Sequence, residues 1–110
     1  MLDGGVFNGD RLFPEAVVER IRAGGDKQKF AMAGYKTLAG GSYTGMWWVF
    51  HNDHGAFAAR GVHGQTIYID PAAEMVLVRL ASFPQAKNAY IDPTSLPAYQ
   101  AVAEYLMMTE

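Results

Sequence analysis

Histidines in the middle of the chain are the side chains best suited to proton transfer or metal binding. His51 and His54 flank Asn52-Asp53 in a His-x-Asp-His run, and imidazole and carboxylate groups both bind zinc. The run also has the composition of a turn, because Asn, Asp and Gly favour turns, and no fourth ligand is obvious. A solvated hairpin turn with no metal is therefore the main interpretation, and a metal-dependent enzyme built on His51, Asp53 and His54 is the alternative.

The remaining histidine, His63, lies in a Gly61-Val62-His63-Gly64 step between two strand-like segments. Loops at the ends of strands often carry functional residues, so His63 is a candidate for contacting a substrate. The alternative is a turn histidine whose ring caps the end of a strand. Trp47 and Trp48 are also candidates for lining a pocket, but adjacent strand residues face opposite sides of a sheet. At most one of the two can therefore face a given ligand.

Composition excludes several classes of function. The 110 residues are 50% hydrophobic and 18% charged, with a formal net charge of −2 and no cysteine. These values predict one folded unit without disulfides or thiolate chemistry, and the lack of a basic cluster argues against nucleic-acid binding. No apolar run approaches the ~20 residues that cross a bilayer, and the start lacks signal-peptide features, so we expect a soluble, cytoplasmic protein. Gly40-Gly41 lacks the spacing of a phosphate loop, and no cofactor is expected.

Turn residues divide the chain into the elements that must position these groups. Residues 1–42 predict a helix that starts at Pro14 and stops at Gly24-Gly25, followed by a loop over 26–42. Residues 43–84 predict strands at about 43–50, 56–62, 65–69 and 75–81, which must be antiparallel because their connections are short. The expected fold class is α+β: an antiparallel β-meander of three to four strands, with an N-terminal and a C-terminal helix.

The C-terminal helix is predicted over residues 94–108. Thr94 or Ser95 can cap it, and Pro97 suits its first turn. Its apolar stripe is expected to pack on the sheet and consists of Ala98, Val102, Tyr105 and Leu106.

The run from Met46 to Pro84 closely resembles the C-terminal sheet of serine hydrolases of the penicillin-binding and class C β-lactamase type. The segments MWW, HNDHGAF and RGVHGQ are most similar to 6-aminohexanoate-dimer (nylon oligomer) hydrolases, and the stretch from Ile69-Asp70-Pro71 to Arg79 also matches the family. Counterparts continue in order and spacing from Met1 to about Met107. The resemblance implies that residues 1–110 form a single C-terminal segment of such a hydrolase domain, with a partial β-lactamase/transpeptidase-like fold.

Enzymes of this type use a Ser-x-x-Lys motif, in which the serine is the nucleophile and the lysine helps to remove its proton. None of the serines, Ser42, Ser82 and Ser95, has a lysine three residues later. The resemblance therefore implies that this chain lacks the nucleophile of the reaction and is inactive alone.

The family's third motif, on the strand that edges the active site, has a counterpart in Arg60-Gly61-Val62. The resemblance implies that the backbone N–H of Val62 is a donor of the oxyanion hole, and that Gly61 lets the substrate approach the backbone closely. Ala59 and Arg60 replace the lysine and the hydroxyl residue that bind the carboxylate of β-lactams. This departure favours small-molecule amides or esters of other acids as substrates.

A different class of function is a non-catalytic binding module or a self-associating fragment. The strand expected at 75–81 would lack the neighbour that it has in the family, and an unpaired apolar strand edge tends to recruit another chain. We therefore expect self-association through this exposed edge, with no partner in the form of nucleic acid or membrane.

Overall fold

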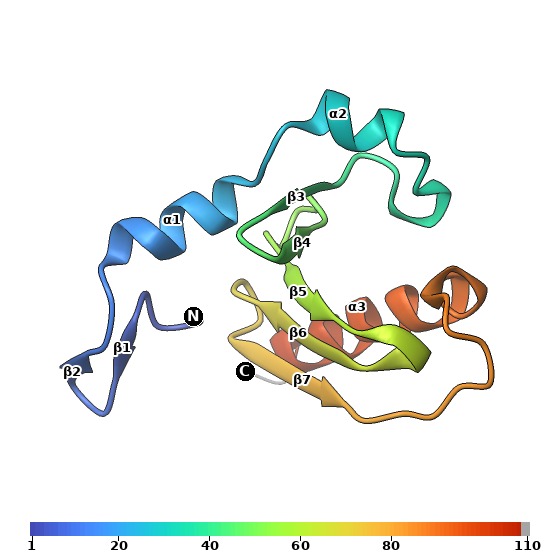
Figure 1. The fold of residues 1–110 in the computed structure, drawn as a ribbon. Helices are drawn as coiled ribbons and strands as arrows, with labels where there is room; N and C mark the ends of the chain where they lie inside the picture. The colour runs from blue at the N-terminus through green and yellow to red at the C-terminus, as the bar shows by residue number, and fades with distance from the viewer. Residues whose placement is uncertain (109–110) are drawn as a thin grey trace.

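The computed structural model describes residues 1–108. Its main element is an antiparallel sheet of five strands (Figure 1). Each strand pairs with the next one along the chain: β3 (Ser42–Thr44), β4 (Trp47–Val49), β5 (Phe57–Arg60), β6 (Thr66–Asp70) and β7 (Met75–Arg79). The predicted α+β class and the antiparallel meander are confirmed. The sheet has five strands rather than three to four, because Gly45 and Met46, with φ of 54° and 71°, form a two-residue hairpin turn inside the segment predicted as one strand.

The N-terminal part folds as a separate hairpin and two helices. Strands β1 (Val6–Phe7) and β2 (Asp10–Arg11) pair across the Asn8-Gly9 turn and precede helix α1 (Glu15–Ala23), which ends at Gly24 as predicted. The loop predicted over 26–42 is partly wrong: it contains helix α2 (Lys27–Met32) and the 3₁₀ turn η1 (Lys36–Leu38). Asp26 starts α2, since its Oδ1 accepts the N–H groups of Gln28 and Lys29 at 2.9 and 3.0 Å.

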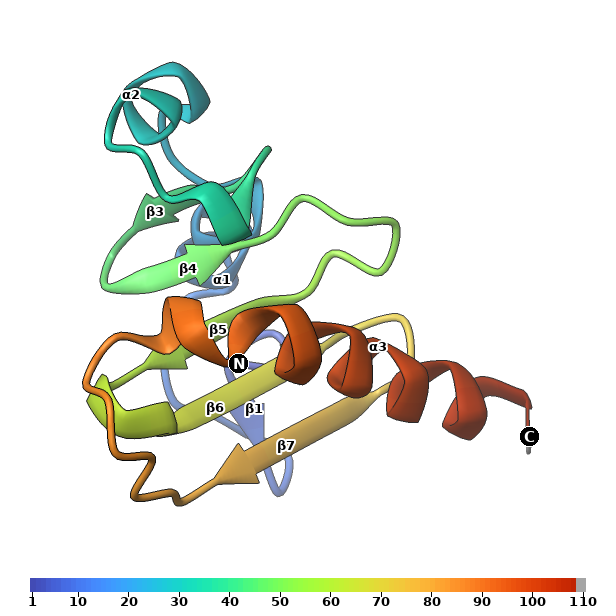
Figure 2. The same cartoon turned by 90° about the vertical axis from the view of Figure 1, so that its right-hand side faces the viewer.

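Helix α3 (Asp92–Met108) crosses one face of the sheet (Figure 2). It begins two residues before the predicted start, so Thr94 and Ser95 lie inside the helix and do not cap it. The predicted buried stripe is wrong as well: Tyr99 and Ala103 are buried against Ala58, Tyr68 and Met75, whereas Ala98, Val102, Tyr105 and Leu106 are exposed.

The charge of Arg79 explains which side of α3 faces inward. Arg79 Nη1, on β7, donates hydrogen bonds to Ser95 Oγ at 2.7 Å and to Tyr99 O–H at 3.3 Å. Arg79 is partly buried, and a guanidinium removed from water needs polar partners, so the helix face with these oxygens lies toward the sheet. The more hydrophobic stripe is left outside.

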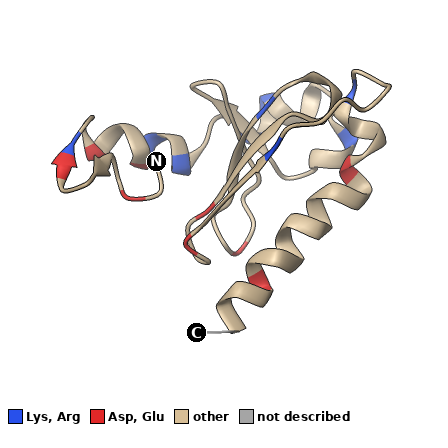
Figure 3. Cartoon of the chain, turned by 90° about the horizontal axis from the view of Figure 1, so that it is seen from below, with Lys and Arg blue, Asp and Glu red and all other residues tan. Residues whose placement is uncertain are grey.

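The other face of the sheet is covered only in part. Val49, Phe57 and Ile69 form a second buried cluster, against which Ile21 of α1 and Trp47 pack. Strand β7 is an edge strand, and its Val76 and Val78 side chains are 50% and 62% exposed. Acidic and basic residues are sparse along α3 (Figure 3), where Asp92 and Glu104 are the charged residues of the described helix. Within residues 1–108, no helix has the length and hydrophobicity to cross a membrane.

Candidate functional site

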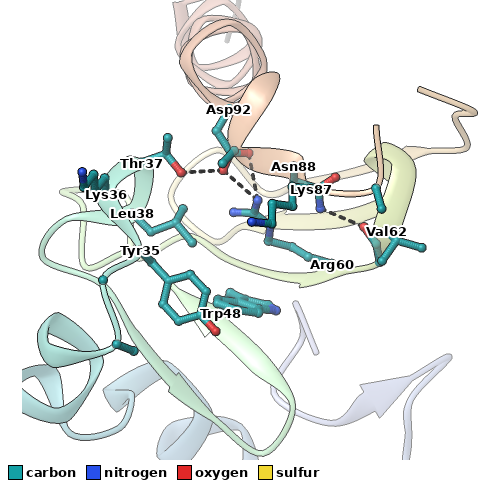
Figure 4. Close-up of a pocket in the computed structure, with 15 residues that line it drawn as sticks. Tyr35, Lys36, Thr37, Leu38, Trp48, Arg60, Val62, Lys87, Asn88 and Asp92 are labelled. Atoms are coloured by element: carbon teal, nitrogen blue, oxygen red, sulfur yellow. Dashed lines mark hydrogen bonds and ion pairs between the residues drawn. The ribbon is translucent and has the colours of Figure 1, made fainter. Parts of the chain in front are cut away.

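A cavity of about 580 Å³ opens beside the end of β5 (Figure 4). It lies between the segment 33–38, the 3₁₀ turn η2 (Val62–Gly64) and the segment 86–92 that leads into α3. Its apolar lining comes from Tyr35, Leu38, Trp48 and Val62; its polar and charged lining comes from Lys36, Thr37, Arg60, Lys87, Asn88 and Asp92. The cavity therefore combines aromatic walls with groups that can bind a polar or anionic part of a ligand.

Gly61 and Val62, singled out from the sequence, both line this cavity. The ladder between β5 and β6 closes at Gly61, whose N–H donates to Gln65 O at 2.9 Å. Val62 follows the ladder, and within residues 1–108 no hydrogen bond is donated by its N–H. This donor is thus outside the sheet pairing, in a residue that is 62% exposed.

Arg60 is anchored by Asp92 of α3. Arg60 Nη2 lies 2.8 Å from both Asp92 oxygens, and Thr37 Oγ1 donates to Asp92 Oδ2 at 2.8 Å. The ion pair is buried, with side chains 8% and 6% exposed, and the guanidinium carbon lies 5.6 Å from the centre of the Trp48 ring. The Asp92 carboxylate is therefore already occupied and is not available to bind a cationic ligand.

Asn88 also lines the cavity and forms hydrogen bonds with the turn that contains Val62 (Figure 4). Its Nδ2 donates to Gly61 O at 2.8 Å, and its Oδ1 accepts the Gly64 N–H at 2.9 Å. Both hydrogen bonds connect residues more than 20 positions apart in the sequence.

His63 is not among the residues that line the cavity. Its Nδ1 donates to the Phe83 carbonyl at 2.7 Å, and its backbone N–H donates to Ala86 O at 3.1 Å. His63 therefore connects the segment 83–86 to η2, and its contact with a substrate stays a prediction.

His51 and His54 do not converge on one point. His51 Nε2 lies 2.7 Å from Ser42 Oγ, whereas His54 Nδ1 donates to Asp70 Oδ2 at 2.7 Å. Within residues 1–108, no three His, Cys, Asp or Glu side chains are grouped so that they could hold a metal ion. The metal-dependent alternative has no assembled ligand set in this region.

The Ser42–His51 pair has the spacing of a nucleophile and its base, but its surroundings exclude that role. Ser42 is fully buried, and its Oγ accepts the Gly25 N–H at 2.9 Å. Burial, with a smaller contribution from the charge of Lys27, lowers the pKa of His51 from its ordinary value. Ser42 lies inside the fold, and together with the partly buried His51 it connects the end of α1 to the sheet.

The two tryptophans separate as expected. Trp48 lines the cavity, while Trp47 packs on Phe57 with ring centroids 5.3 Å apart. Sequence reasoning missed Thr37, Asn88 and Asp92, which lie in segments without a periodic pattern or at a helix start. The sequence Asp92-Pro93 was the available signal for Asp92, since both residues favour helix N-termini. No comparable signal marks Asn88.

Comparisons with known proteins identify the relatives of this chain. Over 85 residues it is 39% identical to the 6-aminohexanoate-dimer hydrolase of Paenarthrobacter ureafaciens, a match that covers 76% of this chain and 22% of that protein. A solved structure from Bacillus anthracis, provisionally named a 6-aminohexanoate-dimer hydrolase, superimposes with a TM-score of 0.79 at 34% identity, over 97% of this chain and 26% of the other. The chain is a partial member of the 6-aminohexanoate-dimer hydrolase family.

This partial member spans about a quarter of the length of these relatives. No protein-family profile matches it. The structural match covers 97% of this chain, so nearly all of the residues that form the sheet, α3 and the cavity lie in the part that the two proteins share.

Proposed function

We propose that this chain forms one side of the active site of a serine hydrolase that cleaves amide or ester bonds in small molecules. The observation that carries the proposal is the Val62 N–H, which is outside the β5–β6 ladder in a residue that lines a 580 Å³ cavity. In the reaction, a serine from polypeptide outside these 110 residues attacks the substrate carbonyl and forms an acyl-enzyme, which water then hydrolyses. The Val62 N–H stabilises the carbonyl oxygen as it gains negative charge.

The composition of the cavity supports a linear amide with an aliphatic chain and a free carboxylate as the substrate class. Trp48, Tyr35 and Leu38 provide an apolar surface for methylene groups. Lys36 and Lys87 also line the cavity and have no carboxylate within ion-pair distance in the described part of the chain. The relative from Paenarthrobacter is named for a dimer of 6-aminohexanoate, which has these chemical features.

The proposal predicts that the 110-residue chain is inactive by itself. We expect neither labelling by a serine-directed fluorophosphonate probe nor turnover of an activated ester. The expectation follows from the lack of Ser-x-x-Lys and from the burial of Ser42 and Ser95. Stoichiometric labelling of the chain would contradict it.

A hybrid enzyme tests the oxyanion role directly. In this hybrid, the chain replaces the matched region of the Paenarthrobacter hydrolase, and hydrolysis of the 6-aminohexanoate dimer is measured. Val62→Pro removes the N–H, and Gly61 already has the extended backbone that precedes proline well, with φ −113° and ψ 171°. We expect kcat to fall by ~10²–10³, whereas Val62→Ala keeps the N–H and should retain most of the activity. Equal rates for the two variants would exclude the role of this amide.

A second candidate function is self-association through the edge strand β7. The supporting observation is the exposure of Val76 and Val78 in β7 and of Leu80 just after it, at 50%, 62% and 87%, along an edge that has no neighbouring strand within residues 1–108. Such an edge presents unpaired N–H and C=O groups together with apolar side chains. Light scattering of the purified chain over a concentration series should show growth from monomer to oligomer; a constant monomer mass at the highest concentration would exclude it.

A further inference from the structure

We infer that Asn88 is a positioning residue that aims the Val62 N–H into the cavity. This inference rests on the proposed function, since it assigns a role to the residue that holds the proposed oxyanion donor. It concerns a side chain from the 3₁₀ turn η3 (Asn88–Tyr90), which precedes α3 and which the sequence alone did not single out.

The peptide group between Gly61 and Val62 connects Asn88 to the proposed donor. The carbonyl of Gly61 and the N–H of Val62 belong to the same planar, trans peptide unit, in which they point in opposite directions. Asn88 Nδ2 donates to that carbonyl at 2.8 Å (Figure 4). Fixing the direction of the Gly61 carbonyl therefore also fixes the direction of the Val62 N–H.

The second hydrogen bond of Asn88 keeps the turn from relaxing. Its Oδ1 accepts the Gly64 N–H at 2.9 Å, so one side chain spans the turn from Gly61 to Gly64. His63 and Gly64 have φ of 61° and 93°, and a positive φ is uncommon for residues other than glycine. The surrounding contacts must hold this conformation, and Asn88 contacts the turn on both sides of His63.

The segment that carries Asn88 is itself fixed to the same turn. His63 N donates to Ala86 O at 3.1 Å, and Phe83 N donates to His63 O at 3.1 Å. These bonds hold the backbone of Asn88 close to η2. The short Asn88 side chain can therefore reach both Gly61 O and Gly64 N.

The hydrogen bond to Gly61 O also affects the strength of the donor. A hydrogen bond accepted by a peptide carbonyl polarises the whole unit and makes its N–H a better donor. Asn88 consequently supports an oxyanion in two ways, through the direction of the Val62 N–H and through its polarity.

Two variants separate the two hydrogen bonds. Asn88→Asp keeps an oxygen that can accept the Gly64 N–H but loses the donor to Gly61 O, whereas Asn88→Ala loses both. In ¹⁵N-resolved NMR spectra of the 110-residue chain, we expect Asn88→Asp to shift the Val62 amide proton upfield while the Gly64 amide stays protected from exchange. Asn88→Ala should alter both amides. A Val62 resonance that is unchanged in Asn88→Asp would overturn the inference.

Kinetics in the hybrid enzyme provide the functional test. Asn88→Asp should lower kcat with little change in KM, because the misdirected N–H acts on the charge that develops in the transition state. The loss should not exceed the ~10²–10³-fold expected for complete removal of the donor. Asn52→Asp is the matched control: Asn52 Oδ1 likewise accepts a backbone N–H, from Ala56 at 3.0 Å, but Asn52 does not line the cavity.

An equal loss of kcat in the Asn88→Asp and Asn52→Asp hybrids would show that Asn88 only stabilises the fold, and would overturn the inference. Failure of the proposed function has a different signature, because then Val62→Pro and Val62→Ala have equal rates. The NMR measurement does not depend on turnover, so it reports the positioning of the Val62 amide independently of the proposed function.

Discussion

The Ser42–His51 contact shows how a single partly buried histidine can make the stability of this chain depend on pH. Ser42 Oγ accepts the Gly25 N–H, so its own hydroxyl proton is free to be donated to His51 Nε2, 2.7 Å away. A neutral ring suits this arrangement, in agreement with the lowered pKa of His51. Protonation of the ring would replace the acceptor by a second donor.

We predict that acidification weakens the fold through His51. The folded pKa is lowered, so its contribution to stability is fully present above the unfolded value of 6.5 and is lost as the pH falls through the folded pKa. Urea unfolding at pH 7.5 and pH 5 should be compared for the wild type and His51→Gln, which cannot titrate. The stability advantage of the wild type should shrink at pH 5. An advantage that is the same at both pH values would contradict the prediction.

Gly24 provides a second prediction at the residue scale. Its φ is +84°, and a Cβ at this position would overlap Ser42 Oγ and lie 2.6 Å from His51 Nε2. Gly40 is the matched control, since its φ is +80° but a Cβ there would meet no atom within 4 Å. Thermal unfolding should show a loss of about 1–2 kcal/mol for Gly40→Ala, from the left-handed backbone alone, and a clearly larger loss for Gly24→Ala. Equal losses would show that the space around Gly24 is not limiting.

At the scale of elements, the buried pair of Arg60 and Asp92 joins strand β5 to helix α3. Removing one partner leaves the other charge buried and unpaired, which typically costs about 3–5 kcal/mol. We therefore predict a loss of this size in the free energy of unfolding for Asp92→Ala. Asp53→Ala, at an exposed position in the loop between β4 and β5, should stay within about 0.5 kcal/mol of the wild type.

A double-mutant cycle distinguishes the ion pair from the loss of packing. Arg60→Met combined with Asp92→Leu replaces both charges by apolar groups, which is often near neutral. The double variant should lose less stability than the sum of the two single variants. Additive losses would show that the two side chains contribute independently.

The edge strand β7 gives the second prediction at this scale. A lysine in place of Val78 puts a charge on the exposed edge and should shift the equilibrium toward monomer, because inward- or edge-placed charges oppose strand pairing. Sedimentation velocity at matched concentrations is the measurement. Met32→Lys is the control, since Met32 is 87% exposed but lies at the end of α2. A similar effect of both substitutions would point to net charge rather than to the edge.

The elements differ in how well the sequence predicts them, for physical reasons. Strands β5 to β7 were predicted because Asn, Asp, Gly and Pro turns separate runs of aromatic and β-branched residues. Helix α2 was missed because its six residues show no period; the Asp26 cap was its only local sign. The inward face of α3 was mispredicted because Arg79 draws polar side chains to the sheet, and a hydrophobic stripe carries no information about such a partner.

At the scale of the whole molecule, the site combines local and distant parts. Gly61 and Val62 were predicted because their motif is contiguous in the sequence. Asn88 and Asp92 contact the same strand end from 27 and 32 positions away, and only the folded chain brings them there. The Val62 N–H donor can therefore be predicted from the sequence, whereas the side chains that hold it in place cannot.

The sequential order of the sheet has a consequence for how the chain reaches this state. Because every strand pairs with its immediate successor, each closure spans a short stretch of chain and has a small entropic cost. Topologies rich in such local pairings fold faster than those that join remote segments. During refolding, the hairpins of the meander should therefore form one after another. The docking of α3 onto Arg60 and Arg79 joins more distant parts of the chain and should be the slowest of these steps.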